Sequence, residues 1–392
     1  MQKKIIVLAI AAAFSAPAFA DTANVTVYGA VNMAVDSVSV GNGAAAGSGN
    51  SYSDSKISSN VTKLGFKGAE DLGDGVSGIW QLEQQIDADN SSATTGANGY
   101  QAQNTLATRN SFVGLSDKSM GTVQLGKMDT PFKSSVRGLD LFDGTIADNR
   151  SLLGGVKGLS AGATFEGRQP DSIAYTSPVM GGVTVAAAYV FGAENANAAT
   201  VNKGSAVSLA AMYKSDNLFG TLAYEVHNFG DANTGDMAGN AVTTGQKESA
   251  VRLGVGYTMD AFQLNAVVER TDDNLAPAAA DTNVYGHTAY YLGGKFNLSS
   301  ANSVKLAYSH ANKTNAVNNA GGSDAASQVS LGFDHNLSKA TSVFALYSLV
   351  SNDDQGQYGL TTASSTGGTG NLATAYAGAK VSVVSLGLKH AF

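Results

Sequence analysis

Apolar and polar residues alternate along most of this chain, which is the pattern of strands with one shielded face. In the segment 248–259, for example, Val251, Leu253 and Val255 share one face. Arg252 falls on the other face. The same period recurs in sixteen segments. It predicts strands near 25–40, 61–70, 76–88, 109–117, 122–129, 172–179, 183–192, 207–216, 221–229, 248–259, 262–271, 284–298, 303–313, 327–337, 341–352 and 380–392.

The connections between these segments alternate in length. Seven are short turns, such as 72–75 and 259–261. Eight are long stretches rich in Gly, Asn, Ala, Ser and Thr, near 41–60, 89–108, 130–171, 193–206, 230–247, 272–283, 314–326 and 353–379. Short turns at one end and long loops at the other are typical of an even-stranded outer-membrane barrel. The sequence therefore predicts an all-β fold, a 16-stranded antiparallel transmembrane β-barrel.

The non-apolar face of these strands repeatedly carries Lys, Arg, Glu and Gln. A soluble β-sandwich or a solenoid adhesin needs a dry interior, so this face favours a wet lumen over either alternative. Sixteen strands leave room for an aqueous channel, whereas eight leave only enough for side chains. A water-filled pore follows from the predicted strand number.

The N-terminus predicts export. Lys3 and Lys4 precede an apolar run, and Ala18-Phe19-Ala20 forms an A-x-A cleavage site. We expect residues 1–20 to be a signal peptide and residues 21–392 to form one barrel domain. The chain has no cysteine and a formal net charge of −7. A basic footprint for nucleic acid is absent.

The last segment alternates strictly and ends on Phe392. A terminal aromatic residue on an apolar face suits a membrane barrel, which carries aromatic girdles at both interfaces. This strand must pair with the segment 25–40 if the barrel closes. We expect Phe392 to lie at the periplasmic girdle.

The third long loop, 130–171, differs from the others because it contains many large apolar residues. They are Phe132, Leu139, Leu141, Phe142 and Ile146, and they are interspersed with the acids Asp140, Asp143 and Asp148. A solvated loop has little use for such residues. We expect this loop to fold inward against the barrel wall.

Several motifs, taken together and in order, resemble the trimeric general diffusion porins of Gram-negative outer membranes, above all their β-proteobacterial branch. They span the predicted mature chain: Val27-Tyr28-Gly29, 63–75, Ile79-Trp80-Gln81-Leu82-Glu83-Gln84, Arg109-Asn110-Ser111-Phe112-Val113-Gly114-Leu115, 121–126, 171–178 and the terminal Phe392.

The resemblance implies that the third loop narrows the pore to an eyelet, where loop acids face basic residues on the wall. By motif position the wall residues are Lys63, Lys67, Arg109 and Arg168, and the loop acids are Asp140 and Asp143. The alternation of inward and outward residues along the strands agrees with this assignment of the wall residues if Leu64, Phe66 and Phe112 point outward. Arg168 is expected just before the sixth strand.

The resemblance also implies a homotrimer in the outer membrane that contacts lipid and lipopolysaccharide. It further implies insertion by the barrel-assembly machinery, which would recognise the strand ending at Phe392.

In some respects the chain departs from the family. Its loop reads Asp140-Leu141-Phe142-Asp143-Gly144 where a Pro-Glu-Phe tip is common, and Ala174 and Thr176 replace a usual Arg and Asp. These departures leave the charge balance of the eyelet open.

Other functions have weaker support. Gly158-Leu159-Ser160-Ala161-Gly162 matches the nucleophile motif of hydrolases, but it lacks the strand-to-helix context that this motif requires. The five histidines lie far apart and show no spacing for a metal or a catalytic site. No enzyme activity and no cofactor are expected.

A channel that prefers anions, phosphate or carboxylates remains the alternative to a general pore. Sugar selectivity is disfavoured, because sugar channels line their path with a ladder of aromatic residues and Trp80 is the only tryptophan of this chain.

Overall fold

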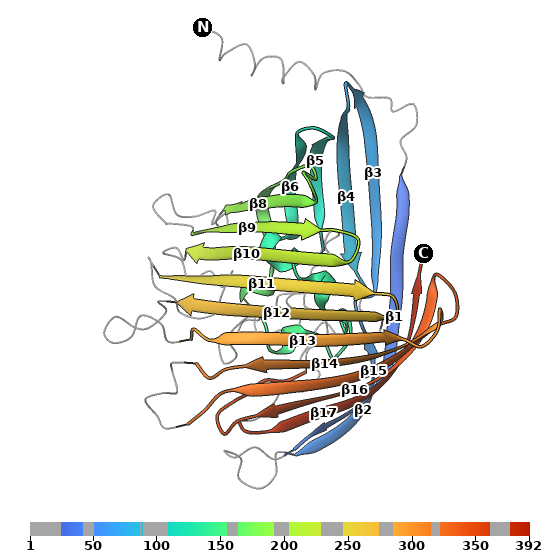
Figure 1. Cartoon of the computed structure of the whole chain (residues 1–392), viewed down its shortest axis with the longest axis vertical. Helices are drawn as coiled ribbons and strands as arrows, with labels where there is room; N and C mark the ends of the chain where they lie inside the picture. Colours follow the sequence, from blue (N-terminus) through green and yellow to red (C-terminus); the bar gives the residue numbers. More distant parts are fainter. Residues whose placement is uncertain are drawn as a thin grey trace, which may run out of the picture.

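The computed structural model describes residues 25–41, 51–86, 88, 109–154, 164–191, 204–228, 246–273, 285–314, 322–360 and 377–392 (Figure 1). The predicted signal peptide, residues 1–20, lies outside the described residues, as does the motif Gly158–Gly162.

Within that part of the chain, seventeen strands form one antiparallel sheet. They are β1 (Thr26–Val40), β2 (Tyr52–Ser59), β3 (Lys63–Gly73), β4 (Val76–Gln85), β5 (Ser111–Asp117), β6 (Gly121–Asp129), β7 (Arg168–Thr176), β8 (Val183–Phe191), β9 (Ser205–Lys214), β10 (Leu218–Asn228), β11 (Lys247–Met259), β12 (Phe262–Asp273), β13 (Thr288–Asn297), β14 (Asn302–Ala311), β15 (Ala326–Asn336), β16 (Thr341–Asn352) and β17 (Lys380–Ala391).

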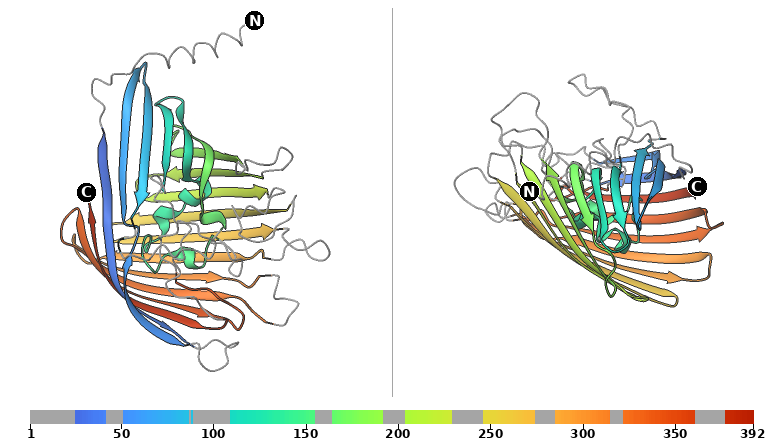
Figure 2. Two further views of the ribbon diagram at one scale, coloured as in Figure 1. Left: turned by 180° about the vertical axis from the view of Figure 1, so that it is seen from behind. Right: turned by 90° about the horizontal axis from the view of Figure 1, so that it is seen from above.

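The sheet closes on itself. Each strand from β3 to β17 pairs with its neighbour in the chain, and β17 pairs with β1. Both β2 and β3 pair with β1, β2 opposite Met33–Val40 and β3 opposite Thr26–Ala30. These two strands therefore fill one position in the wall, and the fold is the closed sixteen-stranded antiparallel barrel that the sequence predicts. The curved wall is visible from two sides in Figure 2.

Two local predictions were wrong. Residues 52–59 form β2, although they were predicted as part of a long loop. Their sequence is polar on both faces, so it shows no period, but β1 is long enough to offer a partner for all of it. In addition, β7 begins at Arg168, so this residue lies within the strand and not before it.

The two faces of the wall have opposite character. Outward side chains are apolar and exposed, as Val251 and Leu253 on β11 show. Between them, Arg252 points inward and is fully buried. A wall that is apolar outside and polar inside matches a barrel surrounded by lipid.

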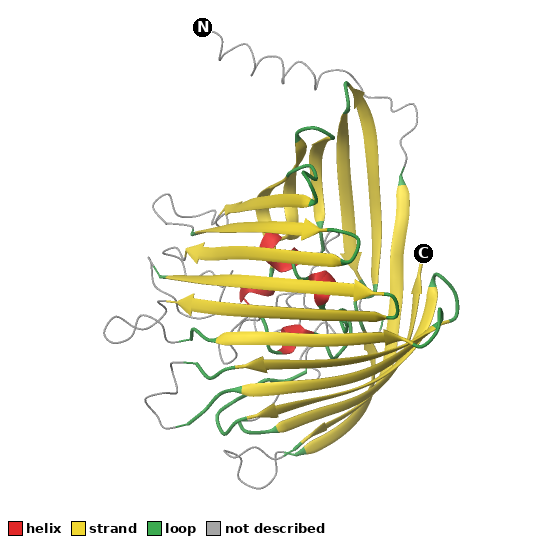
Figure 3. Cartoon of the chain, viewed as in Figure 1, coloured by secondary structure: helices red, strands yellow, loops and turns green. Residues whose placement is uncertain are grey.

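Short helices lie on the inner side of the wall (Figure 3). They belong to residues 130–167, which we call the inner loop: α2 (Pro131–Ser134), η1 (Arg137–Leu139), η2 (Asn149–Ser151) and η3 (Thr164–Glu166). Over the described ranges, none of the helices is long and apolar enough to span a bilayer.

Apolar residues and hydrogen bonds attach the inner loop to the wall. Phe132, Leu139, Phe142 and Ile146 are all buried. Leu139 packs on β11, where a Cβ on Gly254 would lie 2.6 Å from its side chain. Further along, wall side chains bind the loop backbone: Asn265 Nδ2 donates to Leu139 O at 2.7 Å, Tyr291 accepts from Leu141 N at 2.9 Å, and Asn32 Nδ2 donates to Gly144 O at 3.2 Å.

Phe392 completes the seam between the first and last strands. Its N–H donates to Gly29 O at 3.1 Å, and Gly29 N–H donates back to Phe392 O at 2.9 Å. The ring lies beside Gly29, since a Cβ there would lie 2.6 Å from the Phe392 ring. Gly29 therefore leaves the space that the terminal ring occupies, and the ring itself is 55% exposed on the outer surface.

We predict that Gly29→Ala destabilises the barrel, because the new methyl group must displace the Phe392 ring or the strand beside it. A cost of about 1–3 kcal/mol is typical of overpacking. Urea unfolding of the detergent-solubilised protein, followed by the fluorescence of Trp80, measures it. Gly41→Ala is the matched control, since its Cβ would approach no atom closer than 3.6 Å. Equal stability of the two variants would contradict the proposed role of Gly29.

Candidate functional site

The inner face of β3, β4 and the segment before β5 carries a compact charged group centred on Glu83. Lys63 Nζ lies 3.0 Å from Glu83 Oε2, and Arg109 Nε lies 2.5 Å from Glu83 Oε1. The hydroxyl of Tyr28 donates to Glu83 Oε2 at 3.1 Å. The Glu83 side chain is only 6% exposed. Two bases thus surround one carboxylate, and their excess positive charge faces the lumen.

The ring of Tyr28 also supports Lys67. Lys67 Nζ lies 5.2 Å from the ring centre, and Lys63 Nζ lies 5.9 Å from it. The ring lies across Gly65, where any Cβ would overlap it. Cation–π contacts of this kind are worth about 0.5–1 kcal/mol at exposed sites. Lys67 is exposed, so its ammonium remains accessible from the lumen.

A second charged group adjoins the first. Arg168 Nη2 lies 3.1 Å from Asp129 Oδ1, and Arg168 Nε donates to Asn110 Oδ1 at 2.6 Å. Lys133, in α2, lies 2.7 Å from Asp129 through its Nζ. Burial lowers the pKa of Lys133 to about 8, against the opposing pull of the Asp129 carboxylate. Asn110 follows Arg109 in the chain and so joins the two groups into one row.

The inner loop presents Asp143 toward the lumen. Its side chain is 50% exposed and forms an ion pair with Arg137. Arg150 lies 4.0 Å away. Asp143 is therefore a loop acid with access to water.

Asp140 does not face the lumen, and the prediction that it does so is wrong. Its side chain is fully buried within the loop, where it accepts hydrogen bonds from the N–H groups of Phe142 and Asn149. Burial and the neighbouring Asp148 carboxylate raise the pKa of Asp140 to about 7. An aspartate between apolar residues can accept hydrogen bonds from the loop backbone as readily as it can face the lumen. The sequence pattern is the same in both cases, so it does not distinguish them.

Another correction concerns Phe112. Val113 and Leu115 are the exposed, outward residues of β5. Phe112 pairs with Gln81 and lies on the inner face. Arg109 nevertheless reaches Glu83 because β5 begins only at Ser111, so strand parity does not extend back to residue 109.

Sequence reasoning missed the two wall acids. Glu83 shares its face with Gln81 and Gln85, opposite Trp80 and Leu82, and this alternation could have identified it. The alternation of inward and outward residues along β6 could not identify Asp129 as a wall residue. The β6–β7 register shifts between Gly126 and Met128, and such a bulge re-aims the side chains beyond it.

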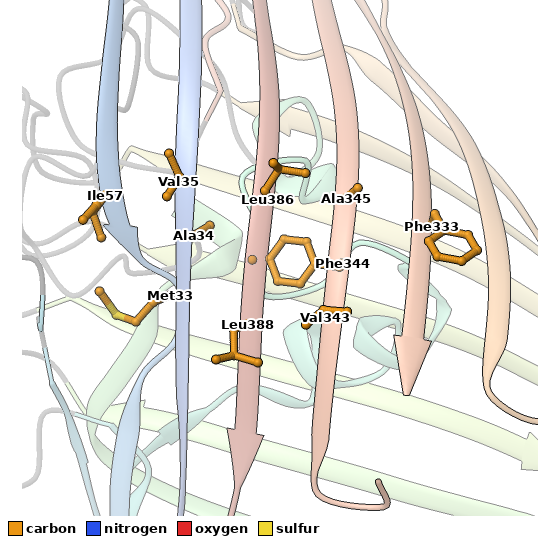
Figure 4. Close-up of a pocket in the computed structure, with 11 residues that line it drawn as sticks. Met33, Ala34, Val35, Ile57, Phe333, Val343, Phe344, Ala345, Leu386 and Leu388 are labelled. Atoms are coloured by element: carbon orange, nitrogen blue, oxygen red, sulfur yellow. The ribbon is translucent and has the colours of Figure 1, made fainter. Parts of the chain in front are cut away.

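A depression of about 550 Å³ lies elsewhere, over β1, β2, β15, β16 and β17 (Figure 4). Its rim includes Val35, Ile57, Leu386 and Leu388, all exposed on the outer face. It is therefore part of the apolar outer surface and separate from the charged row. Across the described ranges, no group of three or more His, Cys, Asp or Glu side chains has a metal-binding arrangement.

Comparisons with known proteins agree on one family. Residues 7–355 match the family model described as Gram-negative porin. The chain is 26% identical over 398 residues to outer membrane porin protein 32 of Delftia acidovorans, with 100% of both chains covered. It is 27% identical over 349 residues to major outer membrane protein P.IB of Neisseria lactamica, covering 87% of this chain and 91% of the relative.

Solved structures show the same fold. The anion-selective porin from Comamonas acidovorans superposes with a TM-score of 0.72 at 22% identity, covering 95% of this chain and 100% of that one. The trimer form of OmpT from Vibrio cholerae gives a TM-score of 0.63 at 15% identity, with 95% and 100% covered.

We predict that Glu83→Gln lowers the free energy of unfolding by about 2 kcal/mol, because it leaves Lys63 and Arg109 without their shared counterion. Denaturant unfolding in detergent at low and high salt measures the loss, which should shrink as salt screens the two bases. Glu70→Gln is the matched control, since Glu70 is an exposed acid on the neighbouring β3. If both variants lose the same stability, Glu83 does not organise the group.

Proposed function

Because this chain belongs to the Gram-negative porin family, we propose that the charged row on its wall and Asp143 on the inner loop form the selectivity constriction of the pore. The protein itself is an outer-membrane porin, a water-filled channel for passive diffusion of small hydrophilic solutes and ions. Its relatives are channels rather than enzymes.

The observation that carries this proposal is the placement of the charges. Lys63, Arg109 and Arg168 lie on the inner face, on the side of the barrel formed by β3 to β7. The helices of the inner loop pack mainly on other strands, with α2 against β8, β9 and β10 and η1 against β11 and β12, although Lys133 of α2 also reaches Asp129 of β6. A loop held mainly on those strands leaves an aqueous gap beside Lys63 and Lys67, which are not buried. Opposed charges across such a gap set a transverse field, which orients dipolar solutes and resists apolar ones.

The excess of bases favours anions. Lys63 and Arg109 contact a single carboxylate, Glu83, and Lys67 lies over the ring of Tyr28, whose hydroxyl donates to the same carboxylate. Arg168 and Lys133 share Asp129 in the same way. Fixed charge of one sign raises the local concentration of the opposite ion. We therefore propose a moderate preference for anions, and the anion selectivity named for the Comamonas acidovorans porin supports it. A channel specialised for phosphate or carboxylates is the alternative within the same class.

For the assembly we propose a homotrimer, supported by the trimer form of the Vibrio cholerae relative. The exposed apolar residues of the outer face, such as Leu253 and Leu386, suit contact with membrane lipid and lipopolysaccharide. The strand that ends at Phe392 is the segment that we propose the barrel-assembly machinery reads.

We predict that pure protein in a planar lipid bilayer gives stepwise conductance. In a salt gradient, the double variant Lys63→Gln/Arg109→Gln should move the reversal potential toward cation selectivity, because two fixed positive charges are lost. Asp143→Asn should move it the other way. Lys339→Gln is the control, since Lys339 is exposed in the turn between β15 and β16.

Each outcome bears on a separate part of the proposal. An absence of conductance steps from folded protein would contradict the pore itself. Conductance with an unchanged reversal potential in the double variant would remove Lys63 and Arg109 from the constriction. Preference of the unmodified channel for phosphate over chloride at equal charge would favour the specialised alternative.

A further inference from the structure

One buried arginine touches both limbs of the inner loop. Arg252 lies on the inner face of β11 and is 0% exposed. Its partners come from the outgoing limb, from the returning limb and from the neighbouring strand β12. We propose that Arg252 is a positioning residue that fixes the inner loop in the channel, and so sets the width and steadiness of the open pore. This inference rests on the channel function proposed above.

On the returning limb, Arg252 binds a carboxylate. Its Nη2 lies 2.7 Å from Glu166 Oε1, and both side chains are almost fully buried. The residue before Glu166 adds a second anchor, because the Phe165 ring stacks on His227 of β10 with ring centres 4.8 Å apart. His227 is itself held between Glu225 at 2.8 Å and Glu248 at 2.7 Å. The returning limb is thus attached to two strands of the wall, β10 and β11.

On the outgoing limb, Arg252 lies over an aromatic ring. Its guanidinium carbon is 4.2 Å from the centre of the Phe132 ring. The Phe132 N–H donates to Ser208 Oγ on β9 at 2.9 Å. A desolvated cation–π contact is stronger than one exposed to water. The start of the loop is therefore bound to the same guanidinium as its end.

A third contact reaches the loop through Glu269 of β12. Arg252 Nε donates to Glu269 Oε2 at 2.7 Å, and Glu269 Oε1 accepts a hydrogen bond from Gly154 N at 2.8 Å. Glu269 is fully buried as well. Arg252 orients this carboxylate, and the carboxylate holds the loop backbone near the point where the outgoing limb leaves the described residues.

Charged contacts fix a position more strictly than apolar ones. Leu139 and Phe142 pack on glycine-lined wall, and hydrophobic attraction of this kind has no preferred direction. Moving Glu166 away from Arg252 leaves a buried carboxylate unpaired, which is strongly unfavourable. The apolar residues therefore supply attraction, and the Arg252 contacts, together with the wall hydrogen bonds to the loop backbone, fix its position.

The test distinguishes an effect on the position of the inner loop from an effect on the stability of the barrel. In Glu166→Gln, the wall pair of Arg252 and Glu269 stays intact while the ionic link to the loop is lost. We expect thermal unfolding close to that of the unmodified protein, but several-fold more closing events in bilayer recordings and a lower closing voltage. Arg252→Lys should give the same phenotype in milder form, because lysine keeps the charge and loses the planar fork.

Phe132→Leu is a second test of the same inference, because it removes the aromatic ring that lies beneath the Arg252 guanidinium. Arg270→Gln is the matched control: it breaks an exposed ion pair with Asp272 on the outer side of β12. Its closing voltage and open-channel noise should equal those of the unmodified channel.

The outcomes distinguish this inference from the proposed function. If the unmodified protein conducts and the Glu166 and Phe132 variants fold with unchanged noise and closing voltage, Arg252 does not position the loop. If these variants instead lose thermal stability in proportion to any change in noise, Arg252 supports the barrel as a whole and the inference is also overturned. If the unmodified protein does not conduct, it is the channel function that fails.

Discussion

The structure depends on one constraint, the need of every backbone N–H and C=O group for a partner where water is absent. Strands satisfy that need in hydrocarbon only when the sheet has no free edge. The pairing of β1 with β17 meets this condition. Closure then dictates the side-chain pattern, since successive residues must face lipid and lumen in turn. The exposed Val251 and Leu253 on either side of buried Arg252 follow directly from it.

Inside the barrel the same closure creates a polar chamber that a loop can occupy. Buried charges are costly unless they are paired, and the inner loop supplies many of the partners. Glu166 meets Arg252, and Lys133 meets Asp129. On β3, by contrast, Lys63 is not buried and Lys67 is exposed, so both retain access to water. An uneven distribution of loop contacts thus produces both a rigid support and a charged aqueous gap.

Much of this could be predicted from the sequence because the period of two is strong wherever a strand faces lipid. The strand number and the end at Phe392 follow from it, while the third loop is recognised by its many large apolar residues. Predictions failed where that period is absent or interrupted. Polar β2 shows no apolar face, and the bulge after Gly126 reverses the parity that would have located Asp129. Asp140 failed for a different reason: a buried acid that caps backbone N–H groups has the same sequence appearance as an exposed one. The contacts of Arg252 with Phe132 and Glu166 join distant segments, and no local pattern encodes them.

The seam between β1 and β17 has a consequence for the order of assembly. Its register joins Ala30 to Ala391 and Val40 to Val381, so every contact in it spans nearly the whole chain. Such non-local pairing is slow to form, because the entropy of closing a very long loop must be overcome first. The backbone of Phe392 bonds that of Gly29 at the end of this seam. Until β17 reaches β1 the barrel cannot close, and any sheet formed by the strands between them keeps two unpaired edges, which are open to pairing with other chains.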